Sequence, residues 1–387
     1  MVFTVYQRNI IVDSNSQSLI RNSKNSSKNQ SSSSSNTISV KTVDWNQLQD
    51  VTYFTRGGSS IIQTAFYDGK EVIIKSIDPE YENNEACKSE LENELKILSI
   101  LNHEHILKLC GSGFKQGKRF LVLERLHRSL SDVVESKSFI QKVRIIRKIT
   151  SAYPLKDGIE YARAIADAVR YCHDSAVPGC MLLHRDLKPG NMGELVIPMH
   201  TFLFLIISIL GFASDGKLKL FDFGLARMLE NASSYSDKKY LMTGKTGSLR
   251  YMAPEVVNKQ PYNYKVDVYS FGIIFCEILS GKKSFRDFTE ERFLSSVVAG
   301  NKRPTMNKAW PKKVIELMEN CWDADMTRRP TFSKIIQVLD DVLVDLRRKK
   351  VISGNTNRLS LILERSSLKK KNSIPGGMML KSVKSLE

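Results

Sequence analysis

The chain has 387 residues, of which 42% are hydrophobic and 26% are charged, and its formal net charge is +17. These values indicate a globular, soluble protein with room for one large or two modest domains. The six cysteines are scattered and form no Cys-x-x-Cys pair, which argues against a zinc site and against a disulfide scaffold. We therefore expect reduced thiols and a cytoplasmic location, and the N-terminus has no sequence of the secretory kind.

Both ends of the chain are polar. Residues 14–37 are mostly Ser, Asn, Lys and Gln. Such a segment has too little apolar surface to offset its chain entropy, so residues 1–44 are predicted to be disordered. Basic runs predict a second disordered segment over residues 346–387. This tail is either a solvated segment or a contact for acidic partners or anionic lipid. No nucleic-acid motif accompanies it, so a nucleic-acid partner is not expected.

Between these ends, strands come first and helices follow. Strands are predicted at 51–54, 61–66, 71–77, 106–109 and 120–123, with a hairpin turn at Asp68-Gly69. One helix is predicted at 85–101, with Leu91, Leu95, Leu98 and Leu101 on one face. Further helices are predicted at 159–173, 265–279, 290–299, 314–322 and 333–343. This order predicts an α+β chain with a β-rich N-terminal lobe and a mainly helical C-terminal lobe.

One short segment carries an acid, a base and an amide at fixed offsets: His184-Arg185-Asp186-Leu187-Lys188-Pro189-Gly190-Asn191. Asp186 can accept a proton from an attacking hydroxyl, Lys188 can neutralise a phosphate, and Asn191 can hold a divalent metal. Three further motifs accompany it, namely Val72-Ile73-Ile74-Lys75, Asp222-Phe223-Gly224 and Ala253-Pro254-Glu255. The ordered set resembles the eukaryotic protein kinases over residues 45–345, and this resemblance implies the bilobal protein-kinase fold.

Further runs narrow the resemblance. Lys188 and residues 246–255 look like those of serine/threonine kinases, and residues 266–272 and 321–330 resemble the tyrosine-kinase-like group. The resemblance implies transfer of the γ-phosphate of Mg-ATP to Ser or Thr hydroxyls of protein substrates in signal transduction. An upstream activating kinase is a further expected partner, and no oligomeric state is implied.

The resemblance also implies roles at matching positions. Lys75 matches the strand lysine that holds the α- and β-phosphates of ATP, and Asp186 matches the base that orients the substrate hydroxyl. Asn191 and Asp222 match the two magnesium ligands. Glu94 matches the glutamate that pairs with the strand lysine. Glu90, one helical turn earlier, is the alternative partner for this lysine.

Other matches concern the activation segment, which in this resemblance is the chain between Asp222 and Glu255. Arg185 matches an arginine that can pair with a phosphorylated activation loop. By its offset from Ala-Pro-Glu, Ser248 matches the hydroxyl residue that touches the catalytic Asp and Lys. Thr243 and Thr246 are then candidate phosphorylation sites, or ordinary polar residues of the loop.

Three matches are structural rather than chemical. The resemblance implies a buried ion pair between Glu255 and Arg329 in the C-terminal lobe. It also implies that Asp267, at the start of a helix, braces the catalytic loop.

The nucleotide-binding positions depart from the family pattern. The expected contacts, besides Lys75, Asn191 and Asp222, are Gly57, Gly58, Ile62, Glu124 and Leu126. The three family glycines fall at Thr55, Gly57 and Ser60, so that only Gly57 is kept. Glycines let main-chain N–H groups approach phosphate closely, so their loss weakens that approach. A pseudokinase, or a scaffold module with weak nucleotide binding, is therefore the alternative function.

A surplus segment separates two of the motifs. Asp186 and Asp222 lie 36 residues apart, about twice the family's usual gap. Removal of residues 193–210 restores the expected hairpin, with Asp215-Gly216 as its turn. The surplus is largely apolar, yet it is shorter than the roughly 20 residues of a membrane span, so membrane contact is not expected. Two interpretations stay open: an unspliced intron read in frame, and a genuine family-specific insertion.

Overall fold

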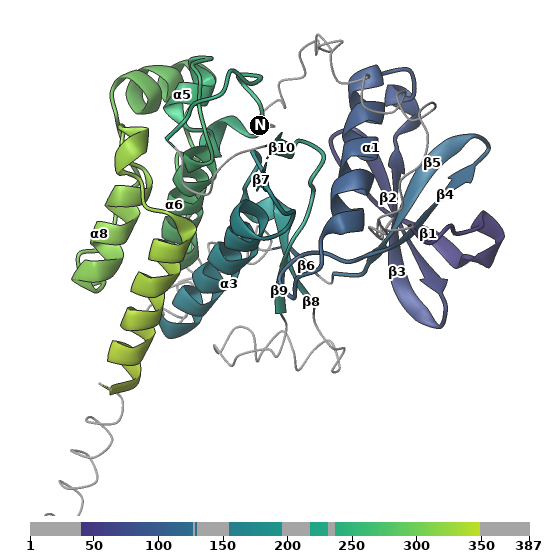
Figure 1. The fold of residues 1–387 in the computed structure, drawn as a ribbon, viewed down its shortest axis with the longest axis horizontal. Coiled ribbons are helices and arrows are strands. Elements are labelled where there is room, and N and C mark those ends of the chain that lie inside the picture. Colours follow the sequence, from purple (N-terminus) through teal and green to yellow (C-terminus); the bar gives the residue numbers. More distant parts are fainter. Residues whose placement is uncertain (1–39, 127, 130–154, 196–216, 231–236, 349–387) are drawn as a thin grey trace, which may run out of the picture. The chain divides into compact units, whose positions relative to one another are not determined.

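The computed structural model describes residues 40–126, 128–129, 155–195, 217–230 and 237–348 (Figure 1). A sheet with one helix forms the N-terminal lobe, and long helices form the C-terminal lobe. Most of the two segments predicted to be disordered, and residues 196–210 of the surplus segment, lie outside the described ranges.

The N-terminal lobe contains a five-stranded antiparallel sheet with the order β1-β2-β3-β5-β4. Its strands are β1 (Gln49–Arg56), β2 (Ser60–Tyr67), β3 (Lys70–Ile77), β4 (Leu109–Lys115) and β5 (Lys118–Glu124). The turn between β2 and β3 is Asp68-Gly69, with φ angles of 52° and 69°. Positive φ at both residues suits the twist of an antiparallel hairpin, and the predicted turn is confirmed.

The predicted strand at 106–109 is wrong, because β4 begins only where that strand was expected to end. Glycines concealed the true strand, since glycine has a low strand propensity. Gly111 is needed for packing: a Cβ there would lie 2.6 Å from Cγ2 of Val43 and 2.7 Å from the main-chain oxygen of Lys41.

The chain before β1 pairs with the free edge of β4. The N–H of Val43 donates to the main-chain oxygen of Ser112 at 2.9 Å, and the N–H of Ser112 donates to that of Lys41 at 3.0 Å. Val43 is buried, and Trp45 packs edge-to-face on Phe120. Such pairing covers backbone groups that an edge strand otherwise exposes. The described structure thus includes residues that precede the expected domain boundary at 45.

Helix α1 (Glu85–Ile100) packs on β3 and β4. It begins after Asn84, whose side chain accepts hydrogen bonds from the N–H groups of Ala86 and Cys87 and caps the helix. The predicted leucine face is buried through Leu91, Leu95 and Leu98. Glu94 is buried on the same helix, which sets a carboxylate against the sheet.

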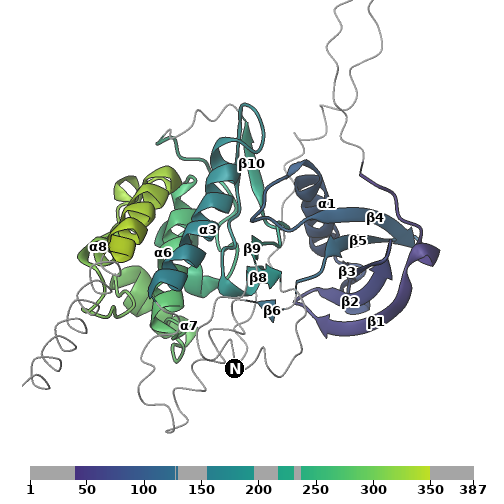
Figure 2. The same cartoon turned by 90° about the horizontal axis from the view of Figure 1, so that it is seen from below.

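The C-terminal lobe is centred on α6 (Lys265–Ser280), which is buried along almost its whole length. Helices α3 (Leu155–Asp174) and α8 (Lys312–Cys321) pack against it (Figure 2). Two further helices, α5 (Pro254–Val257) and α7 (Glu290–Phe293), are short. A further helix covers residues 332–348. The predicted helices are confirmed to within a few residues, except that 290–299 is divided into α7 and a π-helical turn, η7 (Leu294–Ala299).

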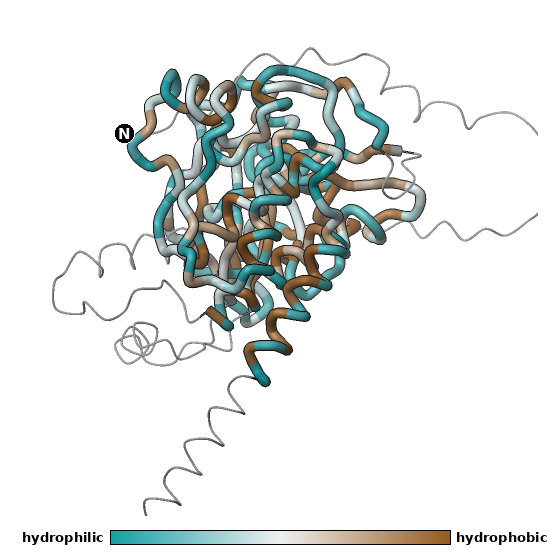
Figure 3. Tube along the Cα trace, turned by 90° about the vertical axis from the view of Figure 1, so that its left-hand side faces the viewer, coloured by the Kyte–Doolittle hydropathy of each residue, from teal (hydrophilic) through white to brown (hydrophobic). Residues whose placement is uncertain are grey.

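Apolar and polar residues alternate along the helices in Figure 3, as expected for helices with one buried face. No helix in the described part of the chain is both long and apolar enough to cross a bilayer. Short 3-10 helices complete the structure, namely η2 (Trp45–Gln47), η3 (Pro79–Tyr81), η5 (Pro189–Asn191), η6 (Leu249–Tyr251) and η8 (Met326–Arg328).

Two small sheets flank the segments that contain the motifs at 184–191 and 222–224. Strands β6 (Arg128–Ser129), β8 (Met192–Leu195) and β9 (Lys217–Leu220) form one antiparallel sheet, and β7 (Cys180–Leu183) pairs with β10 (Arg227–Glu230) in the other. In the β8–β9 hairpin, Met192 lies opposite Leu220 and Leu195 lies opposite Lys217. The first three residues of the surplus range, 193–195, therefore belong to β8.

Candidate active site

Lys75 lies at the centre of a charge cluster in which Glu94 is buried and the other two groups are partly exposed. In the sheet it stands on β3 between Ile62 of β2 and Leu121 of β5. Its Nζ lies 2.6 Å from Oε2 of Glu94 on α1 and 3.0 Å from Oδ1 of Asp222, just after β9. Burial alone would lower the pKa of Lys75, but the carboxylates of Asp222 and Glu94 outweigh it and raise that pKa above its ordinary value. Lys75 is therefore a cation, as phosphate binding requires.

Of the two rival glutamates, Glu94 is the one found in an ion pair with Lys75. Its side chain is only 2% exposed, and burial raises its pKa against the opposing effect of Lys75. Glu90 lies one helical turn earlier, and burial and then the Asp222 carboxylate raise its pKa. The ion pair of Glu94 connects α1 directly to β3.

The residues of the catalytic loop converge on the buried carboxylate of Asp186. It accepts hydrogen bonds from Nζ of Lys188 (2.6 Å), Nδ2 of Asn191 (3.3 Å) and the main-chain N–H of Ser248 (2.8 Å). Nδ2 of Asn191 also donates to the main-chain oxygen of Asp186 at 3.0 Å. The loop therefore brings a carboxylate, an ammonium group and an amide to one point.

Asp267, in the first turn of α6, holds this loop in place. Its carboxylate accepts the main-chain N–H groups of His184 and Arg185, both at 2.9 Å, and lies 2.9 Å from Nε2 of His173. Burial would raise the pKa of Asp267, but the hydrogen bond and charge of His173 lower it. Arg185 has a φ of 65°, which is costly for a residue with a Cβ and needs such outside contacts. The brace expected from the sequence is confirmed.

Asn191 and Asp222 are connected through the main chain. The N–H of Phe221 donates to the main-chain oxygen of Asn191 at 2.9 Å. Burial would raise the pKa of Asp222, but Lys75 and then Lys188 lower it to about 2, so the carboxylate is ionised at neutral pH. Because Nδ2 of Asn191 already donates within the loop, its amide oxygen can act as a ligand. An ionised carboxylate and an amide oxygen are hard donors that fit a divalent cation.

The activation segment reaches Asp186 through the main chain. Ser248 was expected to touch Asp186, and it does so through its main-chain N–H. The preceding Gly247 has a φ of 95°, and a Cβ there would lie 2.6 Å from the main-chain oxygen of Arg185. Only glycine fits this close approach. Gly247 is absent from the residues expected at the site, and its signal in the sequence is a glycine between Thr246 and Ser248.

Arg185 connects the catalytic loop to two other segments. Its Nε donates to the main-chain oxygen of Leu225 at 2.8 Å, and its Nη1 donates to the hydroxyl of Tyr262 at 3.3 Å. That hydroxyl donates in turn to the main-chain oxygen of Thr243 at 2.9 Å, which also accepts the hydroxyl of Thr246. Tyr262 lies outside every motif, so a single sequence carries no signal for it.

The loop between β1 and β2 contains the two glycines expected to cover the nucleotide. The N–H of Gly57 donates to the main-chain oxygen of Ser60 at 2.7 Å, so this amide is engaged within the loop. A Cβ on Gly58 would meet nothing within 4 Å. Gly58 therefore lies in open space, and Ile62 follows on β2.

Glu124, one of the expected nucleotide contacts, is the last residue of β5. Its Oε1 accepts the main-chain N–H of Lys108 at 2.7 Å and lies 3.1 Å from Nζ of Lys219 on β9. The side chain thus connects the two lobes instead of remaining available to a ligand. The nucleotide contacts expected at Glu124 and Leu126 stay predictions.

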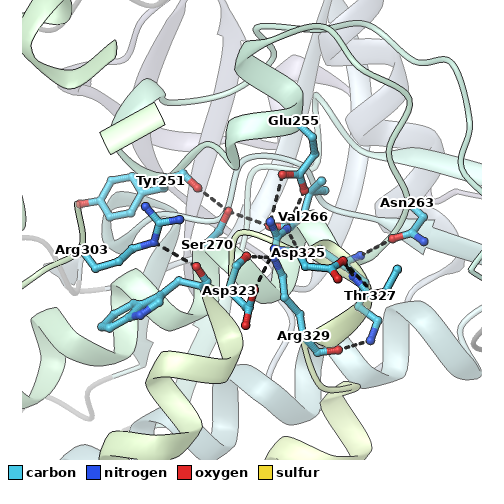
Figure 4. A network of polar contacts seen from close by, with 12 residues as sticks. Tyr251, Glu255, Asn263, Val266, Ser270, Arg303, Asp323, Asp325, Thr327 and Arg329 are labelled. Carbon is cyan, nitrogen blue, oxygen red and sulfur yellow. Dashed lines mark hydrogen bonds and ion pairs between the residues drawn. The ribbon is translucent and has the colours of Figure 1, made fainter. Parts of the chain in front are cut away.

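In the C-terminal lobe, Arg329 and Glu255 form a two-pronged ion pair (Figure 4). Nε of Arg329 also donates to the main-chain oxygen of Asp323 at 2.9 Å, and Nζ of Lys265 donates to the main-chain oxygen of Arg329. The buried pair expected from the sequence is confirmed.

Comparison with known proteins places this geometry in a family. The family model described as the protein kinase domain matches residues 53–339. The chain is 30% identical over 288 residues to the serine/threonine-protein kinase VIK of Arabidopsis thaliana, a match that covers 74% of this chain and 58% of the relative. It is 28% identical over 278 residues to the dual specificity protein kinase shkE of Dictyostelium discoideum, covering 72% of this chain and 34% of the relative.

A third relative, the serine/threonine-protein kinase STY17 of Arabidopsis thaliana, is 26% identical over 302 residues, which are 78% of this chain and 45% of the relative. The chain thus matches between about one third and three fifths of the length of these relatives. Because the family model covers most of the chain, and the motif residues meet around Asp186 and Lys75, the chain belongs to the protein kinase family.

Proposed function

We propose that this chain is a protein serine/threonine kinase that transfers the γ-phosphate of Mg-ATP to hydroxyls of protein substrates. The proposal rests on one observation, the convergence of Lys188, Asn191 and the Ser248 N–H on the buried carboxylate of Asp186. The main-chain bond from Phe221 to Asn191 connects this group to the charge cluster of Lys75.

In this reaction the substrate hydroxyl oxygen bonds to the γ-phosphorus, while the bond from that phosphorus to the bridging oxygen of ADP breaks. The hydroxyl proton passes to the carboxylate of Asp186. Lys188 balances negative charge beside Asp186, and Lys75 holds the phosphates that stay on the nucleotide. Asn191 and Asp222 would hold Mg²⁺, which neutralises phosphate oxygens when it is bound. The chain therefore contributes positioning and charge rather than a covalent intermediate.

Preference for Ser and Thr is supported by Lys188, by the run at 246–255, and by the names of two of the three relatives above. The third is named as a dual specificity kinase, so the acceptor must be tested directly. The purified chain is incubated with labelled ATP, Mg²⁺ and mixed Ser, Thr and Tyr peptides. We expect label on Ser and Thr, and its loss in Asp186→Asn. Label on tyrosine alone would overturn the specificity, and absence of label would overturn the activity.

A scaffold with weak nucleotide binding is the second candidate. Thr55 and Ser60 stand where the family has glycine, and the N–H of Gly57 is already bonded to Ser60. Thermal unfolding with and without Mg-ATP separates the two functions. A kinase should be stabilised by ligand binding, by an amount that grows with ATP concentration. A scaffold with weak nucleotide binding should show almost no shift of its unfolding temperature and no autophosphorylation.

We further propose an upstream activating kinase as a partner and a cytoplasmic location. The first is supported by the exposed Thr243, which is connected to Arg185 through Tyr262. The second is supported by the six cysteines, all of which are free thiols. For the kinase domain we propose residues 45–345, preceded by the β4-paired segment at 41–43.

A further inference from the structure

Asn93 on α1 binds the main chain that follows the metal-binding aspartate. Its Nδ2 lies within donor distance of three carbonyl oxygens, those of Phe223 (3.2 Å), Gly224 (2.9 Å) and Ala226 (3.0 Å). The side chain is partly buried. One side chain therefore gathers three acceptors from a stretch of four residues.

This stretch needs such a partner because it is irregular. Strand β9 ends before it at Leu220, and β10 begins after it at Arg227. Between the strands, the N–H of Ala226 turns back to the oxygen of Phe223 at 3.0 Å. Buried carbonyls outside regular structure must find donors elsewhere. A primary amide has two N–H donors, whereas a carboxylate of the same shape has none.

The same stretch begins with a strained residue. Asp222 has a φ of 68°, in the left-handed region that costs energy for a residue with a Cβ. Such a conformation persists only where its surroundings hold it. The three bonds of Asn93 to the next residues supply that restraint from α1.

Three residues on one face of α1 converge here. Glu90, Asn93 and Glu94 follow the spacing of neighbours on a helix surface. Glu94 holds Lys75, which in turn lies 3.0 Å from Asp222. At Glu90, the main-chain oxygen would lie 3.4 Å from a Cβ placed on Gly224, so the helix and the stretch are in close contact. Helix α1 thus contacts the metal-binding segment both through Lys75 and directly.

We propose that Asn93 is a positioning residue for the proposed phosphoryl transfer: it fixes the backbone of residues 223–226 to α1 and thereby sets the carboxylate of Asp222 for the metal. This rests on the proposed function. With Glu94, it gives α1 two points of attachment, one to Lys75 and one to residues 223–226.

The test compares Asn93→Ala and Asn93→Asp with a control, Lys96→Ala, which changes an exposed residue of the same helix. The first readout is hydrogen exchange of residues 222–226 without nucleotide. We expect faster exchange in both Asn93 variants and no change in the control. Asp has the same volume as Asn, but its carboxylate oxygens cannot donate to the three carbonyl oxygens. Asn93→Asp therefore removes the hydrogen bonds while keeping the packing, whereas Asn93→Ala removes both.

The second readout is the affinity for ATP with and without Mg²⁺, measured by calorimetry. In the original chain, Mg²⁺ should raise the affinity for ATP by a certain factor. Loss of the Asn93 amide should reduce that factor about tenfold, the equivalent of one or two net hydrogen bonds. Affinity for metal-free ATP, which depends on Lys75, should stay within about twofold of the original value. Unchanged exchange and unchanged Mg²⁺ strengthening in both variants would overturn the proposal. If the unmodified chain binds Mg-ATP but transfers no phosphate, the proposed function fails, and the comparison at Asn93 still decides this inference.

Discussion

Arg329 and Glu255, 74 positions apart in the sequence, form a parallel pair of charged hydrogen bonds. Nη1 lies 2.6 Å from Oε1 and Nη2 lies 3.0 Å from Oε2, and the Arg329 side chain is fully buried. A planar guanidinium matches a carboxylate in this geometry, which lysine cannot reproduce. The pair fixes the end of the activation segment to the chain that follows α8.

Loss of one partner of this pair should strongly destabilise the lobe. In Arg329→Met the carboxylate of Glu255 loses its partner in a buried place, and the free energy of unfolding should fall by about 3–5 kcal/mol. Chemical denaturation measures the change. The neighbouring Arg328→Ala is the control, because that side chain is 73% exposed and its loss should cost no more than about 0.5 kcal/mol. Equal effects in the two variants would contradict a special role for the buried pair.

Asp186→Asn should lower the rate of phosphoryl transfer by at least about 100-fold, the scale of a positioned base. The amide keeps the shape of the side chain but cannot take the substrate proton. Steady-state labelling measures the rate, while calorimetry with Mg-ATP checks that nucleotide affinity is retained. A loss of less than tenfold would mean that another group orients the hydroxyl.

Phosphorylation of the activation segment should raise activity. A phosphate on Thr243 or Thr246 adds negative charge near Arg185, which the Tyr262 hydroxyl already connects to Thr243. Mass spectrometry locates the modification, and the rate is measured before and after phosphatase. We expect a lower rate after phosphatase and no response in the double variant Thr243→Ala, Thr246→Ala. An unchanged rate in the modified chain would rule out this activation.

Glu277 should make stability depend on pH. Burial raises its pKa to about 7, against hydrogen bonds from the Ser284 N–H and the Tyr251 hydroxyl and the charge of Arg250. A carboxyl with a raised pKa stabilises the fold most below its unfolded pKa, and this contribution is lost as pH rises to the folded pKa.

The free energy of unfolding should therefore fall by up to about 3 kcal/mol between pH 4.5 and 7 through Glu277 alone. Glu277→Gln, which resembles the protonated form, should remove this decline. Denaturation of both proteins at several pH values gives the difference curve. A difference that stays constant with pH would show that the pKa of Glu277 is the same in the folded and the unfolded chain, which would contradict this prediction.

The β8–β9 register suggests how to remove the surplus segment. Because Leu195 and Lys217 are paired, deletion of 196–214 leaves Asp215-Gly216 as a two-residue turn between them. We expect the shortened chain to bind Mg-ATP and to give a better soluble yield, since a largely apolar run is gone. Deletion of 193–210 is the comparison, because it also removes three residues of β8.

Sequencing of the message across codons 190–212 tests the origin of this segment. An unspliced intron would be absent from most mature transcripts. A dominant transcript that keeps the segment, together with a folded deletion protein that has lost activity, would show a family-specific insertion with a function.

Local patterns in the sequence were enough for much of the fold. The turn at Asp68-Gly69 depends on two neighbouring residues, and the face of α1 depends on leucines one turn apart. The strand at β4 was misplaced because Gly111 weakens the local strand pattern. Glycine is needed at position 111 because Val43, which is far away in the sequence, lies too close to leave room for a Cβ.

The sequence by itself determined which motif residues to seek, since Asp186, Lys188 and Asn191 lie within one loop and their spacing is local. Only the tertiary structure decided which partners they have. It selected Glu94 over Glu90 for Lys75, and it revealed Asn93, whose three acceptors lie about 130 positions further along the chain. Such contacts join elements brought together by packing, and an asparagine within a helix gives no local sign of which carbonyls it will meet.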